Sequence, residues 1–313
     1  MVDFRYHLIS IVGVFLALGV GLLIGSGLLG ERLVEGLRNE VSDVRATNQR
    51  LQGELADQDV RLRQLDASYD DIAPWIVDGE LDGERIVVLT FQSTDGDFVT
   101  DVTASLEQAG ATVTSTIVVR DDVALAGGAV RAELAELLGS SSDDGDALAL
   151  DLAEALGAGA SAERSVAVQR APGVPEDFDA FLGALEDADL AEVTARDGAG
   201  AVPVGGDFVV VGGGDDEPAY DVESFVVALA RALTEGDAPV VAAEPGNSAW
   251  NFVAALRREP DVASAVATVD NADSSLGRIA VVLALDEADR GAPGHYGYDA
   301  GAAGPVPDAT PGA

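Results

Sequence analysis

The first apolar feature of the chain is an uncharged run over residues 8–29. In an α-helix, which rises about 1.5 Å per residue, a run of this length spans roughly the 30 Å hydrocarbon core of a bilayer. The run therefore predicts a transmembrane signal anchor over residues 1–30. A cleaved secretory signal is the alternative, since Arg5 precedes the run and residues 25–27 resemble a small-residue cleavage site. The helical pattern continues past residue 30 without a break, which favours the uncleaved anchor.

Small residues recur every four positions along this predicted span, at Gly13, Ala17, Gly21 and Gly25. Helical residues four apart share one face, and small side chains there let two helix backbones approach closely. Gly21 and Gly25 form the minimal G-x-x-x-G pairing motif. Glycine is also common in membrane helices that do not pair. The spacing predicts that Gly21 and Gly25 lie at a contact between two membrane helices.

Between residues 31 and 73, apolar residues recur with the spacing of a heptad repeat. With Val34 at position a and Leu37 at position d, only Asn48, at a, and Gln58, at d, interrupt the apolar columns through residue 72. So long a repeat predicts a coiled coil, and Asn48 is the kind of buried amide that fixes register and favours a parallel pair. The pattern predicts a parallel homodimer. The alternative is that this amphipathic helix packs against the chain's own domain.

After Pro74 and the glycines at 79 and 83, apolar runs typical of buried strands alternate with helical patterns. The predicted strands are residues 85–91, 112–119, 208–211, 239–243, 265–269 and 279–285, and the predicted helices are 98–109, 177–190, 221–234 and 248–258. Nearly continuous Val, Ile, Leu and Ala strands between helices indicate a mainly parallel sheet with both faces covered. The fold class is therefore α/β, with a Rossmann-like domain over residues 80–290.

Two parts of this region have weaker patterns. Residues 139–206 predict an irregular insertion in which the stretches SSSDDGD and GAGASAE are loops. Residues 291–313 are rich in Gly and Pro and predict a flexible tail.

The chain is strongly acidic, with 55 acidic and 18 basic residues and a formal charge of −37. Such a surface repels phosphates, which argues against nucleic acid as a partner. Solubility is the simpler interpretation of the acidity, and a surface that attracts cations weakly is the other.

The residues do not form a catalytic motif. Gly212-Gly213-Gly214 follows a predicted strand, where α/β sheets bind ligands, but it matches neither G-x-G-x-x-G nor a P-loop and predicts a tight turn. Ser248 lacks a G-x-S-x-G frame, and the histidines are His7 and His295. The acid pairs at 121–122, 143–144 and 215–216 are interpreted as solvated loop ends. We therefore expect no enzyme, no catalytic residue and no bound cofactor.

Orientation in the membrane is not set by charge alone, because Arg5 precedes the span while Arg32, Arg38 and Arg45 follow it among glutamates. A short segment ahead of an apolar anchor normally stays in the cytoplasm while the rest is exported. We expect residues 31–313 outside the cytoplasm.

Both ends of the sequence resemble the actinobacterial copper transporter family. The opening MVDFRYHLISIVGVFLALGVGLLIGSGLL has that family's short Arg/His-bearing segment and an anchor ending in GSGLL, and the stretches TVDNAD at 268–273, Gly277 and GHYG at 294–297 resemble its ending. The resemblance implies a membrane protein of the cell envelope linked to copper homeostasis or efflux, described for the family as an outer-membrane channel. Copper would then be the transported ion.

The residues offer few ligands for that ion. Copper(I) prefers Cys and Met and copper(II) prefers His, whereas this chain has no Cys, one Met and two His. We predict no metal site. The rival class is a non-catalytic structural or regulatory protein that presents its α/β domain to a cell-envelope partner in the cell-wall or septum machinery.

Overall fold

The structure is a computed structural model that describes residues 4–121, 123, 127–164, 177–195, 201–202 and 206–308. The chain divides into two compact units, Met1–Leu65 and Asp66–Ala313.

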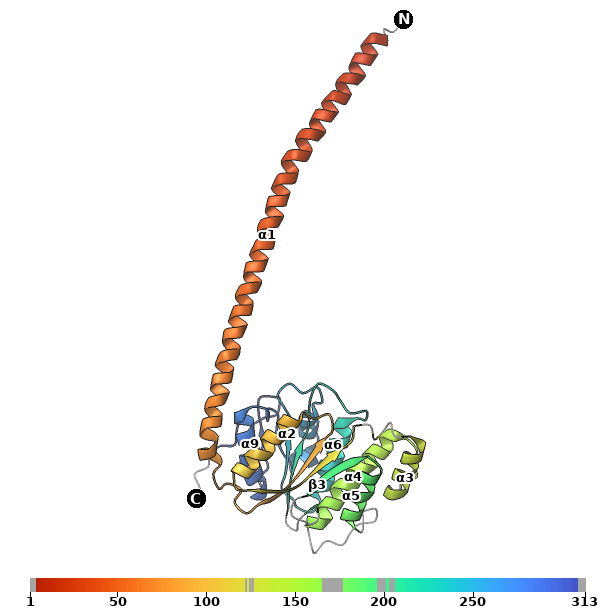
Figure 1. The fold of residues 1–313 in the computed structure, drawn as a ribbon, viewed down its shortest axis with the longest axis vertical. Helices are drawn as coiled ribbons and strands as arrows, with labels where there is room; N and C mark the ends of the chain where they lie inside the picture. The colour runs from red at the N-terminus through yellow and green to blue at the C-terminus, as the bar shows by residue number, and fades with distance from the viewer. Residues whose placement is uncertain are drawn as a thin grey trace. The chain divides into compact units, whose positions relative to one another are not determined.

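A single helix, α1, runs from Phe4 to Val77 (Figure 1). Its segment Arg5–Gly25 is long and apolar enough to cross a membrane, and none of it is buried within the chain. The heptad residues from 37 to 65 are also exposed; Leu37, for example, is 54% exposed and Leu55 65%. An exposed apolar face is what a coiled coil requires, and the pairing itself stays a prediction.

The helix continues beyond residue 73, where the coiled coil was predicted to end, because α1 runs through Pro74 to Val77. A proline removes one helical hydrogen bond. Burial of the residues around it offsets that loss, since Val77 is 1% exposed and Ala73 packs against the same core. Gly79 and Gly83 then form the predicted turn, with φ angles of +80° and +88°.

In the described residues, seven strands form one sheet in the order β3-β2-β1-β4-β5-β6-β7. They are β1 Arg85–Phe91, β2 Thr112–Val119, β3 Ala191–Ala195, β4 Asp207–Val211, β5 Val240–Ala243, β6 Ala267–Val269 and β7 His295–Tyr296. Every neighbouring pair is parallel except β2 and β3, which are antiparallel. The prediction of a mainly parallel α/β sheet is confirmed, with an antiparallel strand at one edge.

Helices cover both faces of the sheet (Figure 1). They are α2 Gly96–Gln108, α3 Gly128–Leu138, α4 Gly145–Arg164, α5 Phe178–Asp187, α6 Val222–Thr234, α7 Phe252–Arg258, α8 Pro260–Ala263 and α9 Ser275–Asp289. Alternate residues of β1 serve the two cores: Val87 and Leu89 pack with α4 to α7, whereas Ile86 and Val88 pack with α2 and α9.

The predicted strand at residues 279–285 is instead the middle of α9. The Ser274 side chain caps this helix by accepting a hydrogen bond from the Gly277 N–H. The run is apolar throughout because the helix is buried on several sides, with Ile279, Val281 and Val282 each at most 3% exposed. An apolar run of this length does not by itself distinguish a buried strand from a buried helix.

The interpretation of residues 139–206 as irregular is wrong where α4 and β3 lie, whereas the helix predicted at residues 177–190 is confirmed as α5. The stretch GAGASAE lies inside α4 because its glycines permit close packing. A Cβ on Gly157 would lie 2.6 Å from the Leu229 carbonyl of α6, and one on Gly159 would lie 2.4 Å from the Phe178 ring. The small residues therefore mark a helix crossing.

The predicted tail also begins inside the fold. β7 pairs in parallel with β6, and Tyr296 is 8% exposed. Residues 309–313 of that prediction lie outside the described residues.

Candidate functional site

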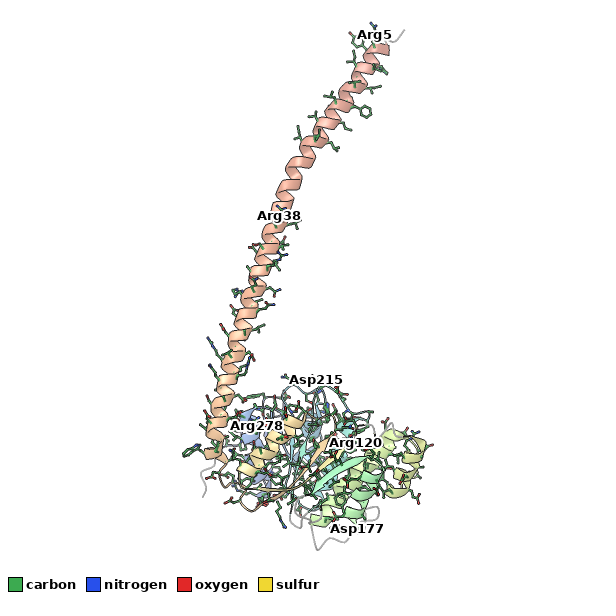
Figure 2. The ribbon with its side chains drawn as sticks, viewed as in Figure 1. Arg5, Arg38, Arg120, Asp177, Asp215 and Arg278 are labelled. Carbon is green, nitrogen blue, oxygen red and sulfur yellow. The ribbon has the colours of Figure 1, made fainter. Side chains whose placement is uncertain are left out.

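The residues predicted to pair two copies lie on open faces of α1. A Cβ added to Gly21 or Gly25 would meet nothing within 4 Å, and Asn48 is exposed. Arg5 and Arg38 likewise project from the bare helix (Figure 2). The chain on its own thus leaves these faces free for another helix.

The Gly212-Gly213-Gly214 segment after β4 is closely packed, but its backbone is irregular and does not form the predicted tight turn. Gly213 has a φ of +120°, and a Cβ on it would lie 2.6 Å from Pro245 Cδ and 2.8 Å from Ser248 Oγ. The Gly214 N–H donates to Ser248 Oγ at 3.3 Å. Because Pro245 and Ser248 fill the space beside Gly213, the segment does not form an open phosphate cradle.

Glu244 follows β5 and is 4% exposed. Its Oε2 accepts a hydrogen bond from the Val253 N–H at 3.0 Å, in the first turn of α7. Burial raises the pKa of Glu244, opposed in part by hydrogen bonds from Ser248 and the backbone of the α7 start. The Asn251 side chain, at the N-cap of α7, makes no capping hydrogen bond. The Glu244 carboxylate instead accepts from the N–H groups at the start of the helix.

A buried ion pair, which the sequence analysis did not identify, joins α7 to β6. Arg257 and Asp270 have side chains 5% and 3% exposed, and Arg257 Nη1 lies 2.6 Å from Asp270 Oδ2. Arg257 also donates to Thr268 Oγ1 at 2.9 Å and to the Tyr296 carbonyl at 2.7 Å. Asp270 accepts a further hydrogen bond from the Tyr298 N–H at 2.6 Å. These contacts bind the C-terminal segment to the sheet.

His295 belongs to the same network. Its Nδ1 lies 2.9 Å from Thr268 Oγ1. Burial, and the nearby charge of Arg257, lower the pKa of His295 below its ordinary value, so the ring is neutral at neutral pH. Ser248 has other partners, the N–H groups of Gly214 and Trp250, and the structure does not bring Ser248 and His295 together as a pair.

The C-terminal motif residues therefore have packing roles. A Cβ on Gly277 would lie 1.8 Å from the Asn271 carbonyl oxygen. A Cβ on Gly297, which has a φ of +120°, would lie 2.0 Å from Asp270 Oδ1. Gly297, Thr268 and His295 contact the network around Arg257, whereas Gly277 packs against the loop between β6 and α9.

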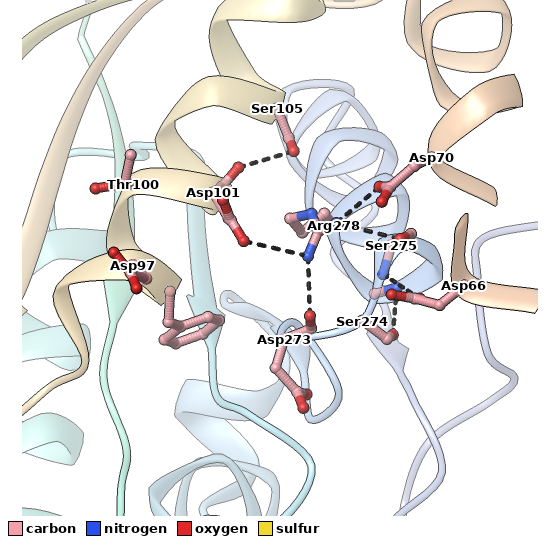
Figure 3. Close-up of polar contacts among 12 residues, drawn as sticks. Asp66, Asp70, Asp97, Thr100, Asp101, Ser105, Asp273, Ser274, Ser275 and Arg278 are labelled. Carbon is pink, nitrogen blue, oxygen red and sulfur yellow. Dashed lines mark hydrogen bonds and ion pairs between the residues drawn. The ribbon is translucent and has the colours of Figure 1, made fainter. Parts of the chain in front are cut away.

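A second charged cluster fixes the last turns of α1 to the α/β domain (Figure 3). Arg278, 12% exposed, lies 2.8 Å from Asp70 of α1 and 3.8 Å from Asp101 of α2. The Ser275 N–H at the start of α9 donates to Asp66 Oδ1 at 2.8 Å. A cavity of about 250 Å³, lined by Arg278, Ser275 and Asp70 among others, lies at this junction.

The acid pairs occupy loop ends. Asp144 caps α4 through the Asp146 and Ala147 N–H groups, and Asp215 lies at the surface of the domain (Figure 2). Asp122 is outside the described residues. Across the part of the chain that the structure describes, no group of three or more His, Cys, Asp or Glu side chains is arranged to hold a metal ion.

Comparison with known proteins adds a relationship over nearly the whole chain. Residues 1–307 match the family model described as "Copper transport outer membrane protein, MctB". The proteins named Copper transporter MctB from Mycobacterium bovis and Mycobacterium tuberculosis are each 30% identical to this chain over 327 residues, covering 96% of it and 98% of their own length. The Mycobacterium leprae protein of the same name is 29% identical over 329 residues, with 96% of this chain covered.

Proposed function

Because the chain belongs to the MctB family, described as copper transport outer membrane proteins, we propose that it takes part in copper transport at the cell envelope. The observation that carries this proposal is the match to that family over residues 1–307, supported by relatives named Copper transporter MctB. The match includes both the apolar N-terminal segment and the residues that enclose the Arg257 network.

In this function copper is the transported ion and not a cofactor of the protein. The chain has no Cys, one Met and two His, and His295 is committed to Thr268. Soft or imidazole ligands are what copper requires, so tight coordination by a single chain is not expected. We propose a contribution by recognition or assembly rather than by catalysis.

We further propose that Arg5–Gly25 anchors the chain in a membrane, with the α/β domain outside the cytoplasm. The exposed apolar surface of this helix suits lipid, and its length suits one crossing. One apolar helix cannot enclose a pore. Transport therefore requires several copies or a second protein.

The proposed assembly is a parallel homodimer. Gly21 and Gly25 would allow the two membrane helices to approach, and Asn48 would hold the two heptad helices in register. All three residues lie on faces of α1 that the chain itself leaves uncovered.

Deleting the protein from its own organism should raise total cell copper and lower the copper concentration that stops growth, because a transport component is missing. Metal content is measured by elemental analysis, and septum placement is scored in the same cells. The wild-type chain should restore both copper readouts. A variant carrying His7→Gln and His295→Asn should restore them equally, because the ion is not held by these rings.

Unchanged copper content together with delayed or misplaced septa would contradict copper transport and favour presentation of the domain to septum machinery. Failure of only the histidine variant, with normal protein levels, would instead show that the chain coordinates the ion.

Replacing Asn48 with Ile should raise the thermal stability of the full-length dimer in detergent and broaden its oligomer distribution. A buried amide without a partner costs about 1–3 kcal/mol, and this penalty selects the aligned dimer over shifted or larger assemblies. Sedimentation equilibrium in density-matched detergent measures the distribution. Gln49→Ile is the matched control, since Gln49 is the adjacent residue outside the a and d columns. Identical behaviour of the two variants would place Asn48 outside any dimer contact.

A further inference from the structure

The last turns of α1 pack against the chain's own α/β domain through one face. Val77 is buried and Ala73 packs beside it, while the Asp66 and Asp70 carboxylates bond to the start of α9 and to Arg278. In the heptad register these four residues are at positions e and b. That side of the helix is therefore already occupied.

A different face of the same turns is uncharged, mainly apolar and exposed. Ser68, Ile72, Trp75 and Ile76, here called the Trp75 patch, are all exposed: Ile72 is 47% exposed, Trp75 86% and Ile76 39%. The contrast with the second tryptophan, Trp250, which is 1% exposed, is large. Tryptophan is the residue most often found at the energetic centre of a protein interface, and exposing most of its ring to water is unfavourable.

The direction of the patch follows from helix geometry. The e and b positions define the side of the helix that faces the domain. With 3.6 residues per turn, the a/d seam lies about 100° around the helix from that side. The d/g seam lies about 160° from it, almost opposite the domain. Ser68 and Trp75 are g positions, Ile72 is a d position, and Ile76, 39% exposed, is an a position at the edge of the patch. At Tyr69, the a position between them, the side chain is already half-buried. A second helix with its own domain therefore has most room on the d/g side.

The negative charge of the chain restricts which surfaces of two copies can come together. Each chain carries a formal charge of −37, and surface charges act over a Debye length of about 8 Å at physiological salt. The Trp75 patch has no charged member, so it is a strip on which two such acidic chains can meet by apolar contact. Its Ile72 is also the last d residue of the predicted heptad repeat, so the patch continues that repeat in the sequence.

We propose that the Trp75 patch pairs with the same patch of a second copy, and that the dimer seam turns there from a/d to d/g. This inference rests on the proposed homodimer and specifies its contact next to the α/β domains. The pairing is isologous, so each copy contributes the same residues. Trp75 is the anchor of this contact, and the small side chain of Ser68 lets the helices approach about two turns before it.

The chain has no cysteine, so any disulfide between two copies must join the cysteines that a substitution introduces. In the full-length protein in detergent, Ser68→Cys should form a disulfide-linked dimer under mild oxidation, because paired Cα atoms in a seam lie within the roughly 4.4–6.8 Å that a disulfide spans. Ala67→Cys is the matched control: it is the adjacent small, exposed residue, but at position f it points away from either seam. Asn48→Cys reports on the proposed homodimer itself.

Efficient linkage at Ser68→Cys and Asn48→Cys, with at least tenfold less at Ala67→Cys, supports the inference. Linkage at Tyr69→Cys instead of Ser68→Cys would overturn it by keeping the seam at a/d. Linkage at Asn48→Cys alone would also overturn it, leaving the homodimer intact and the Trp75 patch open to lipid or to another protein. No linkage at any position would contradict the proposed homodimer and this inference with it.

Discussion

Replacing Arg257 with methionine should lower the free energy of unfolding of the α/β domain by about 3–5 kcal/mol, the usual cost of removing one partner of a buried ion pair. Methionine fills a similar volume but leaves the Asp270 carboxylate, 3% exposed, without its cation. It also removes the donors to Thr268 and to the Tyr296 carbonyl. The loss should loosen the C-terminal segment along with the sheet edge.

Denaturant unfolding of the full-length protein, followed through the emission of the buried Trp250, measures this effect. Arg258→Met is the matched control, because Arg258 is the neighbouring arginine and pairs with Glu223 at the surface with 63% of its side chain exposed. An exposed pair of this kind contributes about 0–1 kcal/mol. Equal losses for the two variants would mean that Arg257 is not held in a buried network in solution.

Replacing Gly277 with alanine should destabilise the domain by about 4 kcal/mol or more, although alanine usually stabilises a helix relative to glycine by about 0.5–1 kcal/mol. The new Cβ would lie 1.8 Å from the Asn271 carbonyl oxygen and 2.9 Å from Ala272 Cα. These are backbone atoms in the loop between β6 and α9. Relief of the clash therefore requires the loop or the helix to move.

Gly183→Ala in α5 is the comparison, since a Cβ there would meet nothing within 4 Å. The two substitutions should change the thermal midpoint in opposite directions, upward for Gly183→Ala and downward for Gly277→Ala. A rise for both would show that the β6–α9 loop accommodates a methyl group and that Gly277 is not required for close packing.

Both predictions concern residues near the C-terminal stretch that carries the family resemblance. Asp270, Gly277, His295 and Gly297 are chemically varied, and in a sequence they suggest a site. In the fold they hold a short edge strand, β7, against β6 and close the loop that starts α9. In this structure these motif residues therefore serve the assembly of the domain.

The sequence alone determined the elements whose signal is local. The uncharged run that ends near residue 29, the heptads beyond it and the strands β1 and β2 were predicted because periodicity over a few residues decides which side chains face water, lipid or a core. The apolar run at 279–285 and the small residues of α4 were misinterpreted, because burial on several sides removes the periodicity that separates a helix from a strand or a loop.

Only the tertiary structure decided which charges meet. Arg278 bonds to Asp70 across 208 residues of sequence, and Ser275 bonds to Asp66 across 209. These two contacts hold the e and b positions in the last turns of α1 against the domain and leave Trp75 exposed. A heptad pattern specifies that a helix has an apolar face, but its own domain covers part of the helix near Val77 and so changes which face is free. That choice depends on contacts between distant segments, which compete for the same surface once the chain has folded.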